Sequence, residues 1–268
     1  MVERRLAKAE VAGSSPVSRS IMKPTFVCLT NVGFLNQVCI TAREANCPKW
    51  TEERHMQKTK KNIMILIASI ICIFGITSLA GLINYIPSPI LQNTARVGLY
   101  ILIALTAFAA MKLTGMKIEI DLKNKRQYLI GIGIALMLSA VIAFIPALCG
   151  FSLVGTHMDF SMGVIINNFM LYMLIIGPVE EFVFRVFYQD AFVGFFEKSK
   201  WLGVVLSALL FGFWHIINGN IIQVLFTFGI GLVFGFARFK IKGCEYAGLA
   251  VGHGLYDFLN TIVRMFVV

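Results

Sequence analysis

The stretch Gly177-Pro-Val-Glu-Glu-Phe-Val-Phe-Arg-Val-Phe-Tyr-Gln189 decides how the rest of this chain must fold. Its neighbours on both sides are apolar enough to lie in a lipid bilayer, yet it carries two carboxylates and a guanidinium within six residues. A charge at the centre of a membrane helix costs about 2.5–3.5 kcal/mol on insertion scales, so such residues are rare and usually functional. The stretch therefore predicts a functional site inside a membrane helix bundle.

Helical spacing gives the two carboxylates of this stretch different neighbours. Glu181 and Arg185 lie on one helical face at the i,i+4 spacing, where they can pair. Glu180 points about 140° away from Arg185 on a helix with 3.6 residues per turn. We therefore expect one carboxylate to be held in an ion pair and the other to be available for chemistry.

The composition is that of a polytopic membrane protein. The 268 residues are 57% hydrophobic and only 14% charged, far outside the profile of a soluble globular domain. The net charge of +10 could suggest nucleic-acid binding. However, the basic residues lie mainly in short segments between apolar runs, where the positive-inside rule accounts for them. We expect an all-α membrane helix bundle. Its expected partner is the lipid bilayer, and no nucleic-acid partner is expected.

Two further classes of site lack support in the sequence. The six cysteines show no C-x-x-C pair and no spacing typical of a disulfide framework. The chain contains neither a Gly-rich phosphate-binding loop nor an H-E-x-x-H motif.

Residues 1–55 differ from the rest, because they contain no long apolar run and no signal-peptide pattern. The stretch Lys8–Ser20 resembles a tRNA gene translated as protein, which points to a bacterial genome. Glu52–Met56 can be encoded by a ribosome-binding site followed by a start codon. We therefore expect a non-native leader and a true start at Met56; the alternative is a disordered N-terminal extension.

From Met56 onward, long apolar runs alternate with short polar breaks, and about 20 apolar residues are enough to cross a bilayer. Seven spans are predicted: residues 62–84, 95–114, 128–149, 162–190, 201–218, 220–238 and 245–267. The fourth run is too long for one straight span, and Gly177-Pro178 is expected to kink it. Residues 56–127 hold the first two spans, and residues 128–268 hold the rest.

The lysines and arginines after Met56 predict the orientation of the chain. Thirteen fall on one side: Lys58, Lys60, Lys61, Lys112, Lys117, Lys123, Lys125, Arg126, Lys198, Lys200, Arg238, Lys240 and Lys242. Only Arg96 and Arg264 fall on the other side. We expect a multi-pass protein of the bacterial cytoplasmic membrane, with Met56 in the cytoplasm and the C-terminus outside.

Three polar side chains are predicted to reach similar depths in this bundle. At about 1.5 Å per helical residue, Glu180, His215 and His253 lie about 21, 22 and 12 Å from the cytoplasmic helix ends. The last two helices also contain Gly231-x-x-x-Gly235 and Gly248-x-x-x-Gly252. Small residues at this spacing let membrane helices approach closely, so we assign these glycines to packing.

The chain has four histidines, of which His55 and His157 fall in the leader and in an external loop and receive no role. His215 ends the run Phe211-Gly-Phe-Trp-His215, and His253 shares a helical face with Asp257. A single histidine in a membrane helix can simply bond to the backbone of another helix. Charged and polar side chains are energetically costly inside a membrane, so several of them in one bundle need a shared explanation. The candidate catalytic residues are six such side chains: Glu180, Glu181, Arg185, His215, His253 and Asp257.

At these residues the chain resembles the CAAX-protease and bacteriocin-processing family of intramembrane proteases, also called the Abi family, which includes the type II CAAX prenyl endopeptidases. Three family motifs match in order: Glu-Glu-x-x-x-Arg at 180–185, Phe-x-x-x-His at 211–215, and His-x-x-x-Asn or Asp at 253–257. The resemblance covers roughly residues 128–268, which it implies form the protease core. Asp257 stands where the better-studied eukaryotic members have Asn.

The resemblance implies hydrolysis of a peptide bond inside a membrane cavity. Glu180 would take a proton from a water held between it and His215. His253, with Asp257 beside it, would stabilise the developing oxyanion or orient the base. Two histidines and a glutamate, Glu180, His215 and His253, could instead ligate zinc. A metal-free reaction is favoured for this family type, and no other cofactor is expected.

Two other classes of function would also place charges within the membrane. A non-catalytic immunity or regulatory protein could use the same fold to bind a peptide or a partner enzyme. An ion-coupled transporter is less well supported, because the two halves of the chain show no inverted repeat. For a protease, we expect a membrane-associated or lipidated substrate, such as a peptide pheromone, a bacteriocin precursor or the tail of a membrane protein.

Overall fold

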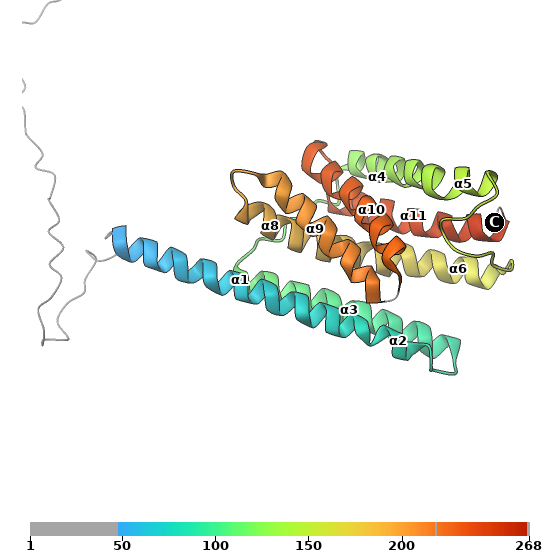
Figure 1. Cartoon of the computed structure of the whole chain (residues 1–268), viewed down its shortest axis with the longest axis horizontal. Coiled ribbons are helices and arrows are strands. Elements are labelled where there is room, and N and C mark those ends of the chain that lie inside the picture. The colour runs from blue at the N-terminus through green and yellow to red at the C-terminus, as the bar shows by residue number, and fades with distance from the viewer. Residues whose placement is uncertain (1–47, 218, 267–268) are drawn as a thin grey trace, which may run out of the picture. The chain divides into compact units, whose positions relative to one another are not determined.

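The computed structural model describes residues 48–217 and 219–266, and these residues form helices and turns without a strand (Figure 1). Of the predicted leader, residues 1–55, the part at 1–47 lies outside the described residues. Helix α1 (Pro48–Ser78) begins ahead of Met56. The helices from Thr51 onward belong to one compact unit.

After α1, the helical segments follow one another with short connections. They are α2 (Ala80–Ile83), α3 (Pro89–Thr114), α4 (Lys125–Leu138), η2 (Ser139–Phe144), α5 (Ile145–Leu148), α6 (Met162–Leu171), η3 (Tyr172–Ile176), α7 (Gly177–Glu181), η4 (Phe182–Gln189), α8 (Asp190–Phe195), α9 (Lys200–Trp214), η5 (His215–Ile217), α10 (Ile221–Lys240) and α11 (Tyr246–Phe266). Four of these begin at a side-chain cap that accepts a backbone N–H, namely Ser88, Asn124, Ser161 and Asn220.

Six helical runs in the described part of the chain are long and apolar enough to cross a membrane. They are Met56–Ile83, Pro89–Thr114, Lys125–Leu148, Met162–Phe195, Lys200–Ile217 and Ile221–Lys240. Helix α11 has 21 residues, enough for a crossing, but it carries His253, Asp257 and Arg264 and falls outside this set. The prediction of an all-α, multi-pass membrane bundle of about seven helices is confirmed.

Close glycine contacts join α11 to its neighbours (Figure 1). A Cβ atom added to Gly248 would lie 2.1 Å from the carbonyl oxygen of Gln127, and one on Gly252 would lie 2.5 Å from that of Gly131. On α10, a Cβ on Gly235 would lie 2.9 Å from the side chain of Val204. Side chains at these positions would collide with neighbouring helices, so the packing role predicted for the glycines is confirmed.

The fourth run departs from α-helical geometry on both sides of its carboxylates. The π-helical segments η3 and η4 flank Gly177–Glu181 in an otherwise continuous run from Met162 to Phe195. A Cβ on Gly177 would lie 2.6 Å from the backbone nitrogen of Gly254, so α7 and α11 touch through their backbones. π-Helical turns are rare and occur frequently at functional sites. The backbone contact between α7 and α11 places the two carboxylates of α7 beside α11.

Apolar clusters fill the bundle around this contact. One joins Ile73 of α1, Ile103 of α3, Phe184 of η4 and Phe211 of α9. A second joins residues of α4, α10 and α11, including Phe234. Within the stretch 177–189, Val183 through Gln189 are all buried. The polar groups of the site are therefore held in a closely packed interior.

A topology measurement checks the predicted orientation. The connections at 115–124, 196–199 and 241–245, together with the helix ends that flank them, carry ten of the thirteen basic residues counted above, and alternating crossings put all three connections on one side. We expect a phosphatase reporter that works only outside the cytoplasm to be active after Val268 and inactive when inserted at Lys198. Reversed activities would overturn the orientation, and activity at neither position would contradict seven crossings.

Candidate active site

Glu181 lies at the centre of a buried polar contact between two helices. Its Oε1 atom accepts a hydrogen bond from Nδ1 of His253 at 2.8 Å, and its Oε2 atom lies 3.3 Å from Nε of Arg185. The side chains of Glu181 and Arg185 are fully buried, and His253 is 3% exposed. The pairing expected from the i,i+4 spacing is present. The carboxylate also fixes a histidine from α11, which helical spacing could not reveal.

Glu180, the neighbouring carboxylate, has different partners. The hydroxyl of Tyr100 on α3 donates a hydrogen bond to Oε1 of Glu180 at 2.9 Å. Oε2 of Glu180 lies 3.6 Å from Nε2 of His253, which is within ion-pair range when the imidazole is protonated. The two carboxylates therefore contact opposite nitrogens of the imidazole of His253. Glu181 lies at hydrogen-bond distance from Nδ1, and Glu180 lies at a longer distance from Nε2.

His253 also approaches a third carboxylate, and two aromatic rings hold it. Its Nε2 atom lies 3.6 Å from Oδ2 of Asp257, the residue one turn later on α11. The ring of Phe234 stacks on the imidazole at 5.4 Å between centroids, and Phe211 meets it edge-on at 5.7 Å. With Nδ1 fixed by Glu181, the ring presents Nε2 between Glu180 and Asp257.

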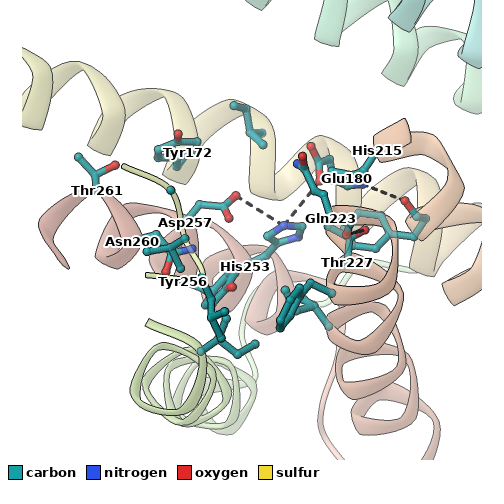
Figure 2. A pocket seen from close by; sticks show the side chains of 18 of the residues that line it. Tyr172, Glu180, His215, Gln223, Thr227, His253, Tyr256, Asp257, Asn260 and Thr261 are labelled. Atoms are coloured by element: carbon teal, nitrogen blue, oxygen red, sulfur yellow. Dashed lines mark hydrogen bonds and ion pairs between the residues drawn. The ribbon is translucent and has the colours of Figure 1, made fainter. Parts of the chain in front are cut away.

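These groups border a cavity of about 550 Å³ (Figure 2). Four of the six predicted residues line it, namely Glu180, His215, His253 and Asp257. Glu181 and Arg185 do not line it and lie behind Glu180 and His253, buried in the bundle. Ligand pockets usually measure about 300–1,000 Å³, so this cavity can admit a short peptide segment.

His215 sits on the cavity wall at the end of α9. Its Nδ1 atom donates to the carbonyl oxygen of Phe211 at 2.9 Å, since a carbonyl can only accept. This bond leaves Nε2 of a neutral ring as an acceptor. Trp214 meets the imidazole edge-on at 5.2 Å between centroids. The ring is therefore fixed with one nitrogen available to a bound water or substrate.

Arg238 supports this arrangement from α10. It donates a hydrogen bond of 2.7 Å to the backbone oxygen of Arg185, and it also donates hydrogen bonds to both carboxylate oxygens of Asp190. A π-helical segment disturbs the regular carbonyl pairing of a helix, so an external donor at Arg185 stabilises this backbone. From the sequence, Arg238 was predicted only as a loop cation, and its contact with the site was missed.

Several polar residues that line the cavity were not predicted as part of the site: Tyr100, Tyr172, Asn220, Gln223, Asn260, Thr261 and Arg264. Most are ordinary polar residues near helix ends. Tyr100 lies on the second span, outside the region in which the motifs occur. No local spacing relates Tyr100 to Glu180, so the sequence carried no signal for it.

A metal centre was the alternative considered for Glu180, His215 and His253. Within residues 48–217 and 219–266, no group of three or more His, Cys, Asp or Glu side chains is arranged to hold a metal ion. Glu181 accepts a hydrogen bond from Nδ1 of His253, and the carbonyl of Phe211 accepts one from Nδ1 of His215, so Nε2 is the remaining nitrogen of each ring.

Comparison with known proteins adds one match. Residues 163–259 match the family model Rce1-like, described as type II CAAX prenyl endopeptidase Rce1-like. Neither a curated protein nor a solved structure matches the chain. The matched segment runs from α6 to α11 and contains all six residues of the predicted site. The resemblance predicted from the three motifs is confirmed: residues 163–259 are similar to the Rce1-like type II CAAX prenyl endopeptidases, a family of membrane proteases.

Proposed function

We propose that this protein is an intramembrane endopeptidase that hydrolyses a peptide bond of a membrane-associated or lipidated peptide. The observation that carries the proposal is the placement of Glu180, whose carboxylate borders the cavity and is oriented by Tyr100 on one oxygen. The match to a membrane-protease family supports the same reading. In a bacterial cell the substrate would be a peptide pheromone, a bacteriocin precursor or the tail of a membrane protein.

The reaction begins with a water between Glu180 and His215. Tyr100 occupies Oε1 of Glu180, so Oε2 is the oxygen that takes the proton from this water. The resulting hydroxide attacks the scissile carbonyl carbon, and Glu180 then returns the proton to the leaving amine. The products are a free carboxylic acid and a free amine, so atoms and protons balance.

His253 and His215 flank the reacting carbonyl in this scheme. Glu181 and the ring of Phe234 fix the imidazole of His253, so it meets developing negative charge without reorganising. Preorganised donors aimed at an oxyanion are commonly the largest contribution to rate acceleration. Asp257 lies 3.6 Å from the same Nε2. In this role Asp257 orients the imidazole, and the oxyanion itself meets Nε2 of His253.

Purified protein in proteoliposomes provides the test of this function. The probe is a mixed library of N-palmitoylated peptides carrying a C-terminal fluorescent label, with cleavage read by mass spectrometry. We expect cleavage within defined sequences, and activity that survives dialysis against a chelator. Peptides that bind without being cut would instead support the immunity or regulatory function, and chelator-sensitive cleavage would contradict the metal-free scheme.

The Tyr100→Phe variant is expected to lower kcat while leaving KM nearly unchanged. It removes the hydrogen bond to Glu180 but keeps the aromatic ring, which packs edge-on against Trp214 at 6.3 Å. Hydrogen bonds to charged groups contribute about 1.5–3 kcal/mol, equivalent to roughly a 10- to 100-fold loss of rate. Tyr172→Phe, which alters another tyrosine of the cavity, is the matched control. Equal effects of both substitutions would argue against a specific role for Tyr100.

A further inference from the structure

The lining of the catalytic cavity is confined to one end of the bundle. On α10 it includes Gln223 and Ile230 but nothing from the second half of the helix. On α11 its lining residues lie between His253 and Arg264, from the middle of that helix to near its end. The remaining wall includes Leu153–Gly155, from the connection between α5 and α6. The cavity therefore extends from Glu180 toward the ends of α5, α6, α9, α10 and α11 that meet on this side.

The opposite end of the bundle is closed behind Glu180. Arg185, Phe187, Tyr188 and Gln189 fill the interior there, each no more than 2% exposed. A second cavity of about 390 Å³ lies beyond them and is lined by Asn62, Asp190, Gly194 and Glu197 among others. Among the described residues, the two cavities have no lining residue in common. Buried side chains therefore separate Glu180 from the second cavity.

Charge distinguishes the two ends. The closed end carries Lys198, Lys200, Arg238, Lys240 and Lys242, whereas in the described part of the chain the end reached by the catalytic cavity carries only Arg96 and Arg264 among the lysines and arginines. Short loops rich in lysine and arginine remain in the cytoplasm. The open end of the catalytic cavity is therefore on the external side of the membrane.

We propose that the substrate is an extended, largely apolar peptide segment that enters the cavity from the external side of the membrane. This deepens the proposed protease function and rests on it. The substrate class is thus an exported peptide, or the external flank of a membrane protein. A cytoplasmic lipidated C-terminus would meet the closed end of the bundle.

The chemistry of the lining matches such a segment (Figure 2). The side chains of Asn220, Gln223 and Asn260 offer amide donors and acceptors for an extended backbone, whose groups need partners when they leave water. Ile142, Val154, Ile222, Phe226 and Ile230 supply apolar wall for its side chains. Arg264, the one arginine or lysine among the described lining residues, donates a 2.9 Å hydrogen bond from Nε to the backbone oxygen of Thr156.

Cysteine labelling tests the direction of entry without requiring activity. The native cysteines, Cys28, Cys39, Cys47, Cys72, Cys149 and Cys244, are first replaced by Ser or Ala. Gln223→Cys then places one thiol in the catalytic cavity. Gly194→Cys places a matched thiol in the second cavity, at a position with open space around the added side chain. A charged, membrane-impermeant maleimide is applied to spheroplasts and to inside-out vesicles.

We expect Gln223→Cys to be labelled several-fold faster in spheroplasts, and Gly194→Cys several-fold faster in inside-out vesicles. Labelling at Gln223→Cys should also block cleavage of the palmitoylated peptide library, whereas labelling at Gly194→Cys should not. Labelling of Gln223→Cys only from the cytoplasmic side, or from neither side, would overturn external entry. If the expected labelling pattern appears but no peptide is cut, the protease function fails and the external opening stands.

Discussion

Replacing Glu180 with Gln should abolish cleavage while leaving the protein inserted and folded. Glutamine preserves the side-chain volume, and its amide oxygen can still accept the hydrogen bond from Tyr100. It cannot take a proton from water, so only the general base is removed. General bases commonly contribute about 10²- to 10⁴-fold to the rate, and we expect a loss of at least that order in kcat.

The measurement needs two readings on the same preparation. Turnover of one identified peptide should fall, while the thermal transition in detergent should stay within about 2 °C, as expected for a change well below about 1 kcal/mol. Glu197→Gln, on the turn between α8 and α9, is the matched control because it removes a carboxylate outside the catalytic cavity. Normal cleavage by Glu180→Gln would exclude Glu180 as the base.

Local spacing explains which parts of the site could be predicted from the sequence. The Glu181–Arg185 pair lies within one helical turn, and its geometry follows from the chain itself. The same reasoning placed Asp257 beside His253 on α11. The close helix contacts of Gly248 and Gly252 follow from their small size and four-residue spacing. In each case, the spacing of residues within one helix was enough for the prediction.

Contacts between helices could not be predicted in this way. Helical spacing predicts Asp257 as the partner of His253, whereas the shortest polar contact of the ring is with Glu181 of α7. The bond between Tyr100 and Glu180 joins helices 80 residues apart in the chain. Helical spacing describes the face on which a side chain lies, but the register between two helices depends on packing along their whole length. The fold class and the motif residues were therefore predictable, and their mutual hydrogen bonds were not.

Replacing Glu181 with Gln should lower both activity and stability, in contrast to the change at Glu180. The substitution leaves Arg185 fully buried without its carboxylate. Breaking a buried ion pair by removing one partner costs about 3–5 kcal/mol, because an uncompensated charge stays behind. Glu181→Gln also weakens the bond that fixes Nδ1 of His253, so the surviving protein should turn over slowly.

A double variant separates these two losses. Glu181→Gln combined with Arg185→Met removes the unpaired charge, and an apolar replacement of a buried pair is often neutral or better. We therefore expect thermal stability and accumulation in the membrane to recover in large part. Activity should recover much less, since His253 still lacks the carboxylate that orients it. If Glu181→Gln proves stable and inactive while Glu180→Gln cleaves normally, the roles of the two carboxylates are the reverse of those argued here.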